Sequence, residues 1–274
     1  MKLYRTLHGA ILEREGALLQ LDLDWDSLFL AEDLPARLLA ATAGALPLRS
    51  LVDAPLVAPI GSQEIWAAGV TYWRSRAARM AEANHAGGGS FYDRVYEAER
   101  PELFFKGAGW RARGPGQPVR IRRDSGWNVP EPELVLCANA RGEIVGYTIG
   151  NDMSSRDIEG ENPLYLPQAK VYDGSCALGP CLLVSAEPLA PETPIRLTIR
   201  RAGAAVFQGE TALERMRRER RELVSWLFRE TTFPAGVYLL TGTGVVPPED
   251  FTLQSGDEVR IEIPPIGELV NAVE

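Results

Sequence analysis

Short apolar segments, separated by turn-forming residues, recur along most of the chain after residue 64. Strands without regular alternation with helices predict a β-rich α+β fold of mixed sheets. One stretch has clear helical spacing, Glu219–Phe228, where Leu223 and Leu227 share a side with Phe228. The segments that we predict as strands are Ile65–Val70, Glu102–Lys106, Val119–Ile121, Glu133–Cys137, Ile144–Asn151, Cys181–Ser185, Ile195–Arg200, Val237–Thr241 and Glu258–Ile263.

The first part of the chain has a pattern of its own. Strand-like alternation covers Tyr4–Glu13 and Ala17–Asp22, and helical spacing follows at Pro35–Ala43. A proline-rich stretch at Pro55–Pro59 then marks a boundary. We therefore predict a small N-terminal α/β domain at residues 1–57 and a larger β-rich domain at residues 58–274.

Three carboxylates in the second domain predict a metal site. Glu131 and Glu133 flank Pro132, so on an extended segment both side chains point to one face. Asp152 would complete an oxygen-rich set of the kind that Mg2+, Mn2+ or Ca2+ accept. Such pairs also occur on the wet face of ordinary strands, but the apolar run Leu134–Cys137 places this pair at the mouth of a buried element.

Composition narrows the class of protein. The 274 residues are 45% hydrophobic and 24% charged, which suits a globular protein with a large core. The net charge of -8 argues against a nucleic-acid partner. Five arginines between residues 215 and 221 are interleaved with glutamates, so we predict a solvated helix with internal ion pairs there.

The same sequence argues against a membrane location. No uncharged stretch approaches the ~18 apolar residues of a membrane span, and no apolar segment of a signal peptide follows Met1. The cysteines are few and lie in apolar, strand-like surroundings at Cys137, Cys176 and Cys181. These features predict core thiols in a reducing compartment and a cytoplasmic protein.

Several motifs, in order, resemble the fumarylacetoacetate hydrolase superfamily over roughly residues 56 to 274. Several motifs in the right order are far more specific than any one alone. They are Gly69-Val70-Thr71-Tyr72, Phe104-Phe105-Lys106, Glu131-Pro132-Glu133-Leu134, Gly146 to Asp157, Ala169-Lys170, Leu178-Gly179-Pro180 and Thr241-Gly242-Thr243-Gly244.

The resemblance implies a site as well as a fold. By carry-over, Glu131, Glu133 and Asp152 are implied to be the metal ligands, with Lys170 as the active-site lysine beside them. Thr243 is implied to hold a substrate carboxylate. The family also implies its β-rich catalytic fold, a magnesium cofactor with Mn2+ or Ca2+ as alternatives, a 2-oxo acid as small-molecule substrate, and a homodimer.

One departure from the family bears on the reaction. Hydrolytic members usually activate water with a histidine and a glutamate, at positions where this chain has Ser75 and Ala78. The chain contains two histidines, His8 and His85, so this dyad cannot form at its usual place. The chain resembles instead the family's dehydratases of 2-oxo-3-deoxy sugar acids, in Gly69–Tyr72, in the stretch from Tyr92 to Glu102, and in the stretch from Ile158 to Lys170.

Dehydration needs an acid and a base near the metal. A metal-chelated 2-oxo acid forms an enolate at C3, and Lys170 is a candidate to transfer that proton. A salt bridge to a ligand carboxylate is the alternative role for this lysine. Glu159 or Glu161 could protonate the departing C4 hydroxyl.

Further candidates lie near a segment that could close over the substrate. Residues 74–100 have helical patterns on either side of three glycines, which suits a lid or a plain surface loop equally. Tyr72, Arg74 and Arg76 are candidates to hold the acid, and Lys106 is a further one. His85 would be the imidazole able to reach the site.

Two other classes of function stay open. A C–C bond hydrolase or an oxaloacetate-type decarboxylase of the same superfamily would keep the metal ligands and differ in substrate. A non-enzymatic protein that binds sugar acids would keep the pocket without turnover. The retention of all three ligands and of Lys170 disfavours the second class.

Overall fold

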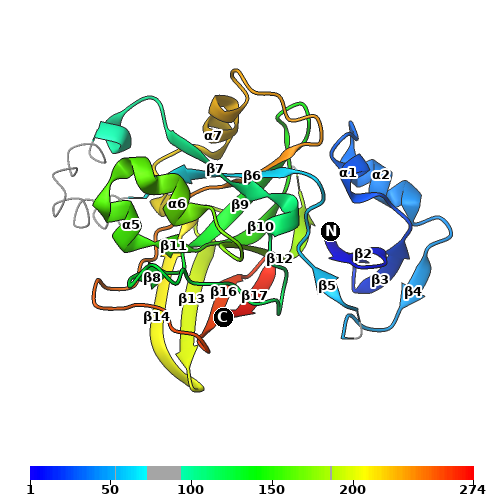
Figure 1. Ribbon diagram of the computed structural model, residues 1–274. Coiled ribbons are helices and arrows are strands. Elements are labelled where there is room, and N and C mark those ends of the chain that lie inside the picture. Colours follow the sequence, from blue (N-terminus) through cyan, green and yellow to red (C-terminus); the bar gives the residue numbers. More distant parts are fainter. Residues whose placement is uncertain (53, 73–93, 186) are drawn as a thin grey trace.

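The computed structural model describes residues 1–52, 54–72, 94–185 and 187–274 (Figure 1). Within these ranges, eleven strands form one large sheet in the order β4-β3-β2-β1-β12-β10-β9-β15-β6-β7, with β5 pairing β1. The strands of this sheet are β1 (Lys2–Thr6), β2 (Gly9–Arg14), β3 (Ala17–Leu21), β4 (Leu46–Leu48), β5 (Leu56–Val57), β6 (Glu64–Gly69), β7 (Glu102–Ala108), β9 (Pro132–Ala138), β10 (Ile144–Asp152), β12 (Cys176–Val184) and β15 (Val237–Leu240).

A second sheet of four described strands packs against the middle of the first. Its order is β14-β13-β16-β17, and its strands are β13 (Pro194–Arg201), β14 (Ala204–Ala212), β16 (Glu258–Ile263) and β17 (Gly267–Ala272). A short pair, β8 (Asn128–Val129) with β11 (Ser154–Ser155), lies beside the site. The mixed, strand-rich architecture is the one that the apolar pattern predicted.

Strand β9 is buried on both faces, which explains its unbroken apolar sequence. Leu134 and Leu136 belong to a core that also contains Leu197 and Ile261 of the second sheet. The intervening residues, Val135 among them, face the other core, formed with the N-terminal elements. Successive side chains of a strand point to opposite faces, so one apolar strand serves two cores.

The helices whose two ends lie in the described ranges are short. Two are capped by aspartates, α1 (Trp25–Leu28) by Asp24 and α2 (Leu34–Ala41) by Asp33. The others with described bounds are α5 (Arg156–Glu161), α6 (Leu166–Lys170) and α7 (Arg220–Leu227), with 3₁₀ turns η1 (Gly109–Arg111), η2 (Pro163–Tyr165) and η3 (Leu213–Arg215). Among the described residues, no helix combines the length and apolar character that crossing a membrane requires.

Several elements differ from the sequence prediction. Val119–Ile121 is not a strand, and Val119 forms only an isolated bridge with Val273. Strand β12 begins five residues before the predicted Cys181 and contains Gly179-Pro180, a pair of residues that are both unfavourable inside strands. Strands β14 and β17 were missed, since β14 is largely exposed and β17 starts at a glycine.

The N-terminal elements join the large sheet directly. Strand β1 pairs with β12 through Lys2 and Leu3. The N-terminal helices and strands, in blue, lie at the right of Figure 1. The core on this side contains Leu12 and Leu28 together with Leu178 and Leu182. The division into domains at residues 57 and 58 stays a prediction.

Candidate active site

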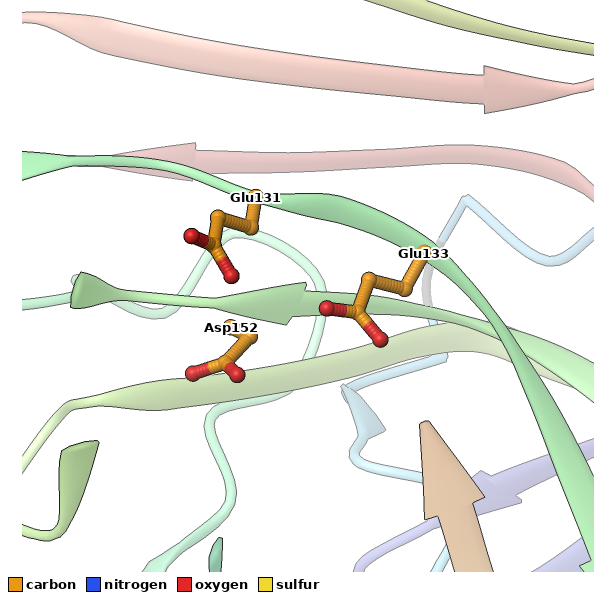
Figure 2. Close-up of side chains that lie close together, drawn as sticks. All are labelled: Glu131, Glu133 and Asp152. Carbon is orange, nitrogen blue, oxygen red and sulfur yellow. The ribbon is translucent and has the colours of Figure 1, made fainter. Parts of the chain in front are cut away.

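The register of β9 and β10 places the three carboxylates on one face. Glu133 lies opposite Gly150, and the Asp152 amide donates to the Glu131 carbonyl at 3.0 Å. Glu131 and Glu133 therefore point the same way, toward Asp152 on the neighbouring strand (Figure 2). One oxygen from each of the three lies within 4.8 Å of the others. The structure thus brings together the residues that the sequence predicted as ligands.

Burial makes this cluster costly without a cation. Glu131 is 5% exposed, and Glu133 and Asp152 are each 1% exposed. Burial raises the pKa of Glu133 well above its usual range, and the charges of Asp152 and Glu131 raise it further. A buried, oxygen-only donor set with mutual repulsion is what a hard divalent cation stabilises. The three residues therefore fit a magnesium-type ion.

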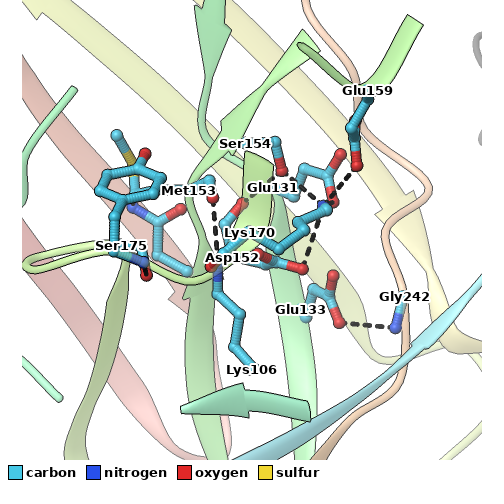
Figure 3. A network of polar contacts seen from close by, with 12 residues as sticks. Lys106, Glu131, Glu133, Asp152, Met153, Ser154, Glu159, Lys170, Ser175 and Gly242 are labelled. Atoms are coloured by element: carbon cyan, nitrogen blue, oxygen red, sulfur yellow. Dashed lines mark hydrogen bonds and ion pairs between the residues drawn. The ribbon is translucent and has the colours of Figure 1, made fainter. Parts of the chain in front are cut away.

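Lys170, the last residue of α6, lies among these carboxylates (Figure 3). Its Nζ donates to Glu131 Oε2 at 2.8 Å, to Asp152 Oδ2 at 3.1 Å and to Ser154 Oγ at 2.5 Å. It also forms an ion pair with Glu159 Oε1 at 3.5 Å. This position allows both roles that the sequence left open, proton transfer and a salt bridge to a ligand.

Lys106 reaches the same cluster from β7. Its Nζ pairs with Asp152 Oδ1 at 2.5 Å and donates to the carbonyls of Met153 at 3.0 Å and Lys170 at 2.5 Å. An ammonium has three donors, and these three contacts use them all. Lys106 thus holds the Asp152 carboxylate and the end of α6, and its predicted contact with substrate stays a prediction.

Arg156 is a site residue to which the sequence reasoning gave no role. It is 1% exposed at the start of α5, and its Nη2 donates to Glu131 Oε1 at 2.5 Å. Its Nε lies 3.6 Å from Glu159 Oε2. The two oxygens of Glu131 thus have different cationic partners, Arg156 and Lys170. Arg156 belongs to the motif that follows Asp152, and that was the available signal.

The backbone after β15 holds the third carboxylate. The Gly242 amide donates to Glu133 Oε2 at 2.6 Å, and Gly242 has a φ of +87°. A Cβ at this glycine would lie 2.1 Å from Thr71 Oγ1, so the turn has room for glycine alone. Thr243 is buried next to it, and its hydroxyl exchanges hydrogen bonds with Val245.

The remaining predicted residues differ in where they lie. Glu159 is 2% exposed inside the cluster, whereas Glu161 is exposed to solvent. Tyr72 is buried, and burial together with the Glu133 charge raises its pKa. Arg74, Arg76 and His85 lie outside the described residues, as do Ser75 and Ala78.

Known proteins share both the sequence pattern and the fold. The chain is 48% identical over 225 residues to a Haloferax volcanii protein named "Probable 2-keto-3-deoxyxylonate dehydratase", covering 82% of this chain and 76% of that protein. It is 42% identical over 224 residues to 2-dehydro-3-deoxy-D-arabinonate dehydratase of Saccharolobus solfataricus, covering 81% and 75%.

A solved structure with a related name resembles this chain over its whole length. It is 2-keto-3-deoxy-D-arabinonate dehydratase complexed with magnesium and 2,5-dioxopentanoate, with a TM-score of 0.85, 34% identity, and coverage of 100% of this chain and 99% of that one. The family model described as fumarylacetoacetate (FAA) hydrolase C-terminal matches residues 70–274. The chain belongs to the fumarylacetoacetate hydrolase family.

Proposed function

We propose that this protein is a metal-dependent hydro-lyase that removes water from a 2-oxo-3-deoxy sugar acid. The observation that carries the proposal is the convergence of Lys170 and Glu159 on the buried carboxylates Glu131, Glu133 and Asp152. The named activities of the two sequence relatives support the same reaction.

The carboxylates would hold the cation, with Mg2+ as the first candidate and Mn2+ or Ca2+ as alternatives. When bound, such a cation supplies Lewis-acid stabilisation to the negative charge that a 2-oxo acid develops as C3 loses its proton. Ion pairs hold two of these carboxylates in place, Arg156 with Glu131 and Lys106 with Asp152. Residues of this kind orient ligands and tune affinity without touching the substrate.

Lys170 and Glu159 divide the proton transfers between them. In the proposed reaction the C3 proton passes to the Lys170 amine, a C3–C4 double bond forms, and the C4–O bond breaks. The hydroxyl leaves as water with a proton from Glu159. The 3.5 Å separation of Lys170 Nζ and Glu159 Oε1 lets the proton return from lysine to glutamate between turnovers.

The substrate would be held by the residues that the sequence singled out. Tyr72, Arg74, Arg76 and Thr243 remain our proposed contacts to its carboxylate and hydroxyls. Lys106 is the weakest member of this set, because its three donors already have acceptors inside the protein.

A C–C bond hydrolase or an oxaloacetate-type decarboxylase is the competing proposal. Both would use the same carboxylates, so the centre does not separate them from a dehydratase. The sequence disfavours the hydrolase, because Ser75 and Ala78 stand in place of the water-activating pair of hydrolytic relatives, and substrate preference separates the decarboxylase. Elimination needs no nucleophilic water, so it tolerates this loss.

A substrate panel tests the proposal. Purified protein with Mg2+ should dehydrate 2-oxo-3-deoxy sugar acids much faster than it cleaves acylpyruvates or oxaloacetate, and EDTA should abolish turnover. In deuterated water the product should carry label at C3 once its enol ketonises, and no pyruvate should form. Faster release of pyruvate from an acylpyruvate would make the hydrolase the better assignment.

We also propose that the protein acts as a homodimer in the cytoplasm. The family resemblance supports the dimer, and the buried free thiols of Cys137, Cys176 and Cys181 fit a reducing compartment. Light scattering on the purified protein should give twice the mass of one chain, and the mass of a single chain would contradict the dimer.

A further inference from the structure

The loop Met216–Arg218 connects η3 to α7 and contacts two distant parts of the chain. The interleaved charges here predicted a solvated helix, but α7 begins only at Arg220. Of the internal ion pairs expected, the structure shows Arg218 with Glu222 at 3.2 Å. The prediction of a solvated helix is therefore wrong for Arg217 and Arg218, whose guanidinium groups point to residues 94–100.

Arg218 binds the end of a helical turn. Residues 94–97 are helical, and Arg218 donates to the carbonyls of Val95 at 3.2 Å, Ala98 at 2.5 Å and Glu99 at 2.6 Å. Its side chain is 9% exposed. The last carbonyls of a helix lack donors within the helix, and the Arg218 guanidinium supplies those donors here.

Arg217 holds the same turn from outside. Its guanidinium lies 4.6 Å from the centre of the Tyr96 ring, donates to the Tyr96 carbonyl and pairs with Glu97 at 3.0 Å. Its backbone amide donates to the Thr71 carbonyl at 3.0 Å. The loop thus connects residues 94–99 to Thr71, two residues after the end of β6.

The fastened segment forms one wall of a cavity beside the active site. Residues 94–103 face Pro163 and Leu166 across a space of about 550 Å³. Leu166 begins α6, which ends in Lys170. Glu102 lines this cavity and shares a face of β7 with Phe104, whose ring centre lies 5.8 Å from Lys170 Nζ.

We propose that Arg217 and Arg218 are positioning residues that hold residues 94–100 as the substrate-side wall of the active site. This inference rests on the proposed dehydration. The metal centre has its own supports, since the neighbours of Lys106 on β7, Phe105 and Gly107, both pair with β6. Loss of either arginine should therefore weaken substrate capture while leaving metal binding and the chemical step intact.

The test compares arginines from the same stretch. Arg218→Met and Arg217→Met remove the contacts, Arg218→Lys keeps the charge, and Arg215→Met is the matched control because Arg215 is exposed in η3. Hydrogen exchange should rise about tenfold for the peptide covering residues 94–103 in both contact variants, as expected when such hydrogen bonds are lost. Arg218→Lys should restore part of the protection, and the control should match the wild type.

Kinetics and metal titration complete the test. With a 2-oxo-3-deoxy sugar acid, KM should rise roughly tenfold in Arg217→Met and Arg218→Met, with kcat within about twofold of wild type, as for lost uniform binding. The Mn2+ affinity measured by calorimetry should also stay within about twofold of the wild-type value. Unchanged exchange in both variants, a fall in kcat at constant KM, or equal effects in Arg215→Met would overturn the proposal.

The variants also keep the two proposals distinguishable. Because the Arg217 side chain is 39% exposed, Arg217→Met should fold even if Arg218→Met does not. If the wild type dehydrates no sugar acid, the proposed function fails, and the exchange of residues 94–103 still decides whether the arginines hold this wall.

Discussion

The three carboxylates of the centre differ in what neutralises them. Glu131 has Arg156 and Lys170, and Asp152 has Lys106 and Lys170. Glu133 accepts from the Gly242 amide, and no ion pair to it is found among the described residues. A backbone amide compensates a buried charge less than an ammonium or guanidinium does. Glu133 is therefore the carboxylate whose ionisation depends most on a bound cation.

Replacing Glu133 tests that dependence. Glu133→Gln keeps the shape and removes the charge, so Mn2+ affinity should fall by at least ~10-fold. In EDTA the variant should unfold at the same temperature as the wild type or higher, because burial and the neighbouring carboxylates disfavour an ionised Glu133 and a neutral amide avoids that cost. Calorimetry and thermal unfolding measure the two effects. Unchanged affinity would remove Glu133 from the ligand set.

Lys170 offers the test that separates its two roles. Lys170→Met keeps the bulk of the stem and removes the ammonium, so turnover should fall by roughly 10²–10⁴ if the lysine moves the C3 proton. Mn2+ should still bind. Loss of metal binding, with normal turnover once the site is saturated, would leave the lysine as a salt-bridge partner only.

Glu159 and Glu161 form a natural matched pair. Both are two residues apart on α5, but only Glu159 is buried beside Lys170. Glu159→Gln should lower kcat by at least ~100-fold, since an amide cannot donate the proton that the leaving hydroxyl needs. Glu161→Gln should match the wild type. Equal effects of the two changes on kcat would contradict the assignment of the acid.

At the scale of elements, the turn after β15 connects the sheet to the carboxylate cluster through the Gly242 amide, which binds Glu133. Gly242→Ala should lower both thermal stability and Mn2+ affinity, because its Cβ would lie 2.1 Å from Thr71 Oγ1 and would shift the amide that binds Glu133. Gly256→Ala is the control, since this glycine also has a positive φ, +89°, but has nothing within 4 Å of an added Cβ.

The two changes share the cost of a left-handed backbone, about 1 kcal/mol. The additional loss in Gly242→Ala reports the close contact with Thr71. Thermal unfolding and Mn2+ titration measure it. Identical stability and metal affinity in the two variants would show that the turn adapts without disturbing Glu133.

Strands with an apolar run or with regular alternation could be predicted from the sequence, and those with neither signal could not. The run in β9 is buried on both faces, and β16 alternates between half-buried and buried positions, so each pattern identifies a strand. Strand β14 is half-exposed or exposed along its whole length, and its pairing with β13 gives no comparable signal. Helices α5 and α6 are one to two turns long, too short for a helical period to show.

At the scale of the molecule, the site is assembled from segments far apart in sequence. The spacing of Glu131, Glu133 and Asp152 predicted a shared face, because strand geometry relates neighbours along and across a pair. No such local rule relates Lys106 on β7 to the carbonyl of Lys170 on α6. That contact depends on how a sheet edge packs against a helix, and only the folded chain shows it.

The N-terminal elements share a sheet and a hydrophobic core with the rest of the molecule. Removing residues 1–57 would strip β1 from the edge of β12 and expose the core around Leu178 and Leu182. The lost side chains include Leu3, Leu12 and Leu28, each fully buried and each contributing about 1.5–3 kcal/mol.

Residues 58–274 alone should therefore unfold at least ~10 °C below the full chain, or aggregate through the freed strand edge. Thermal unfolding and size-exclusion chromatography of the two proteins measure this. A shortened chain that keeps the full melting temperature and Mn2+ affinity would establish residues 1–57 as a separate domain. Loss of both would make the N-terminal strands part of the unit that holds the metal centre.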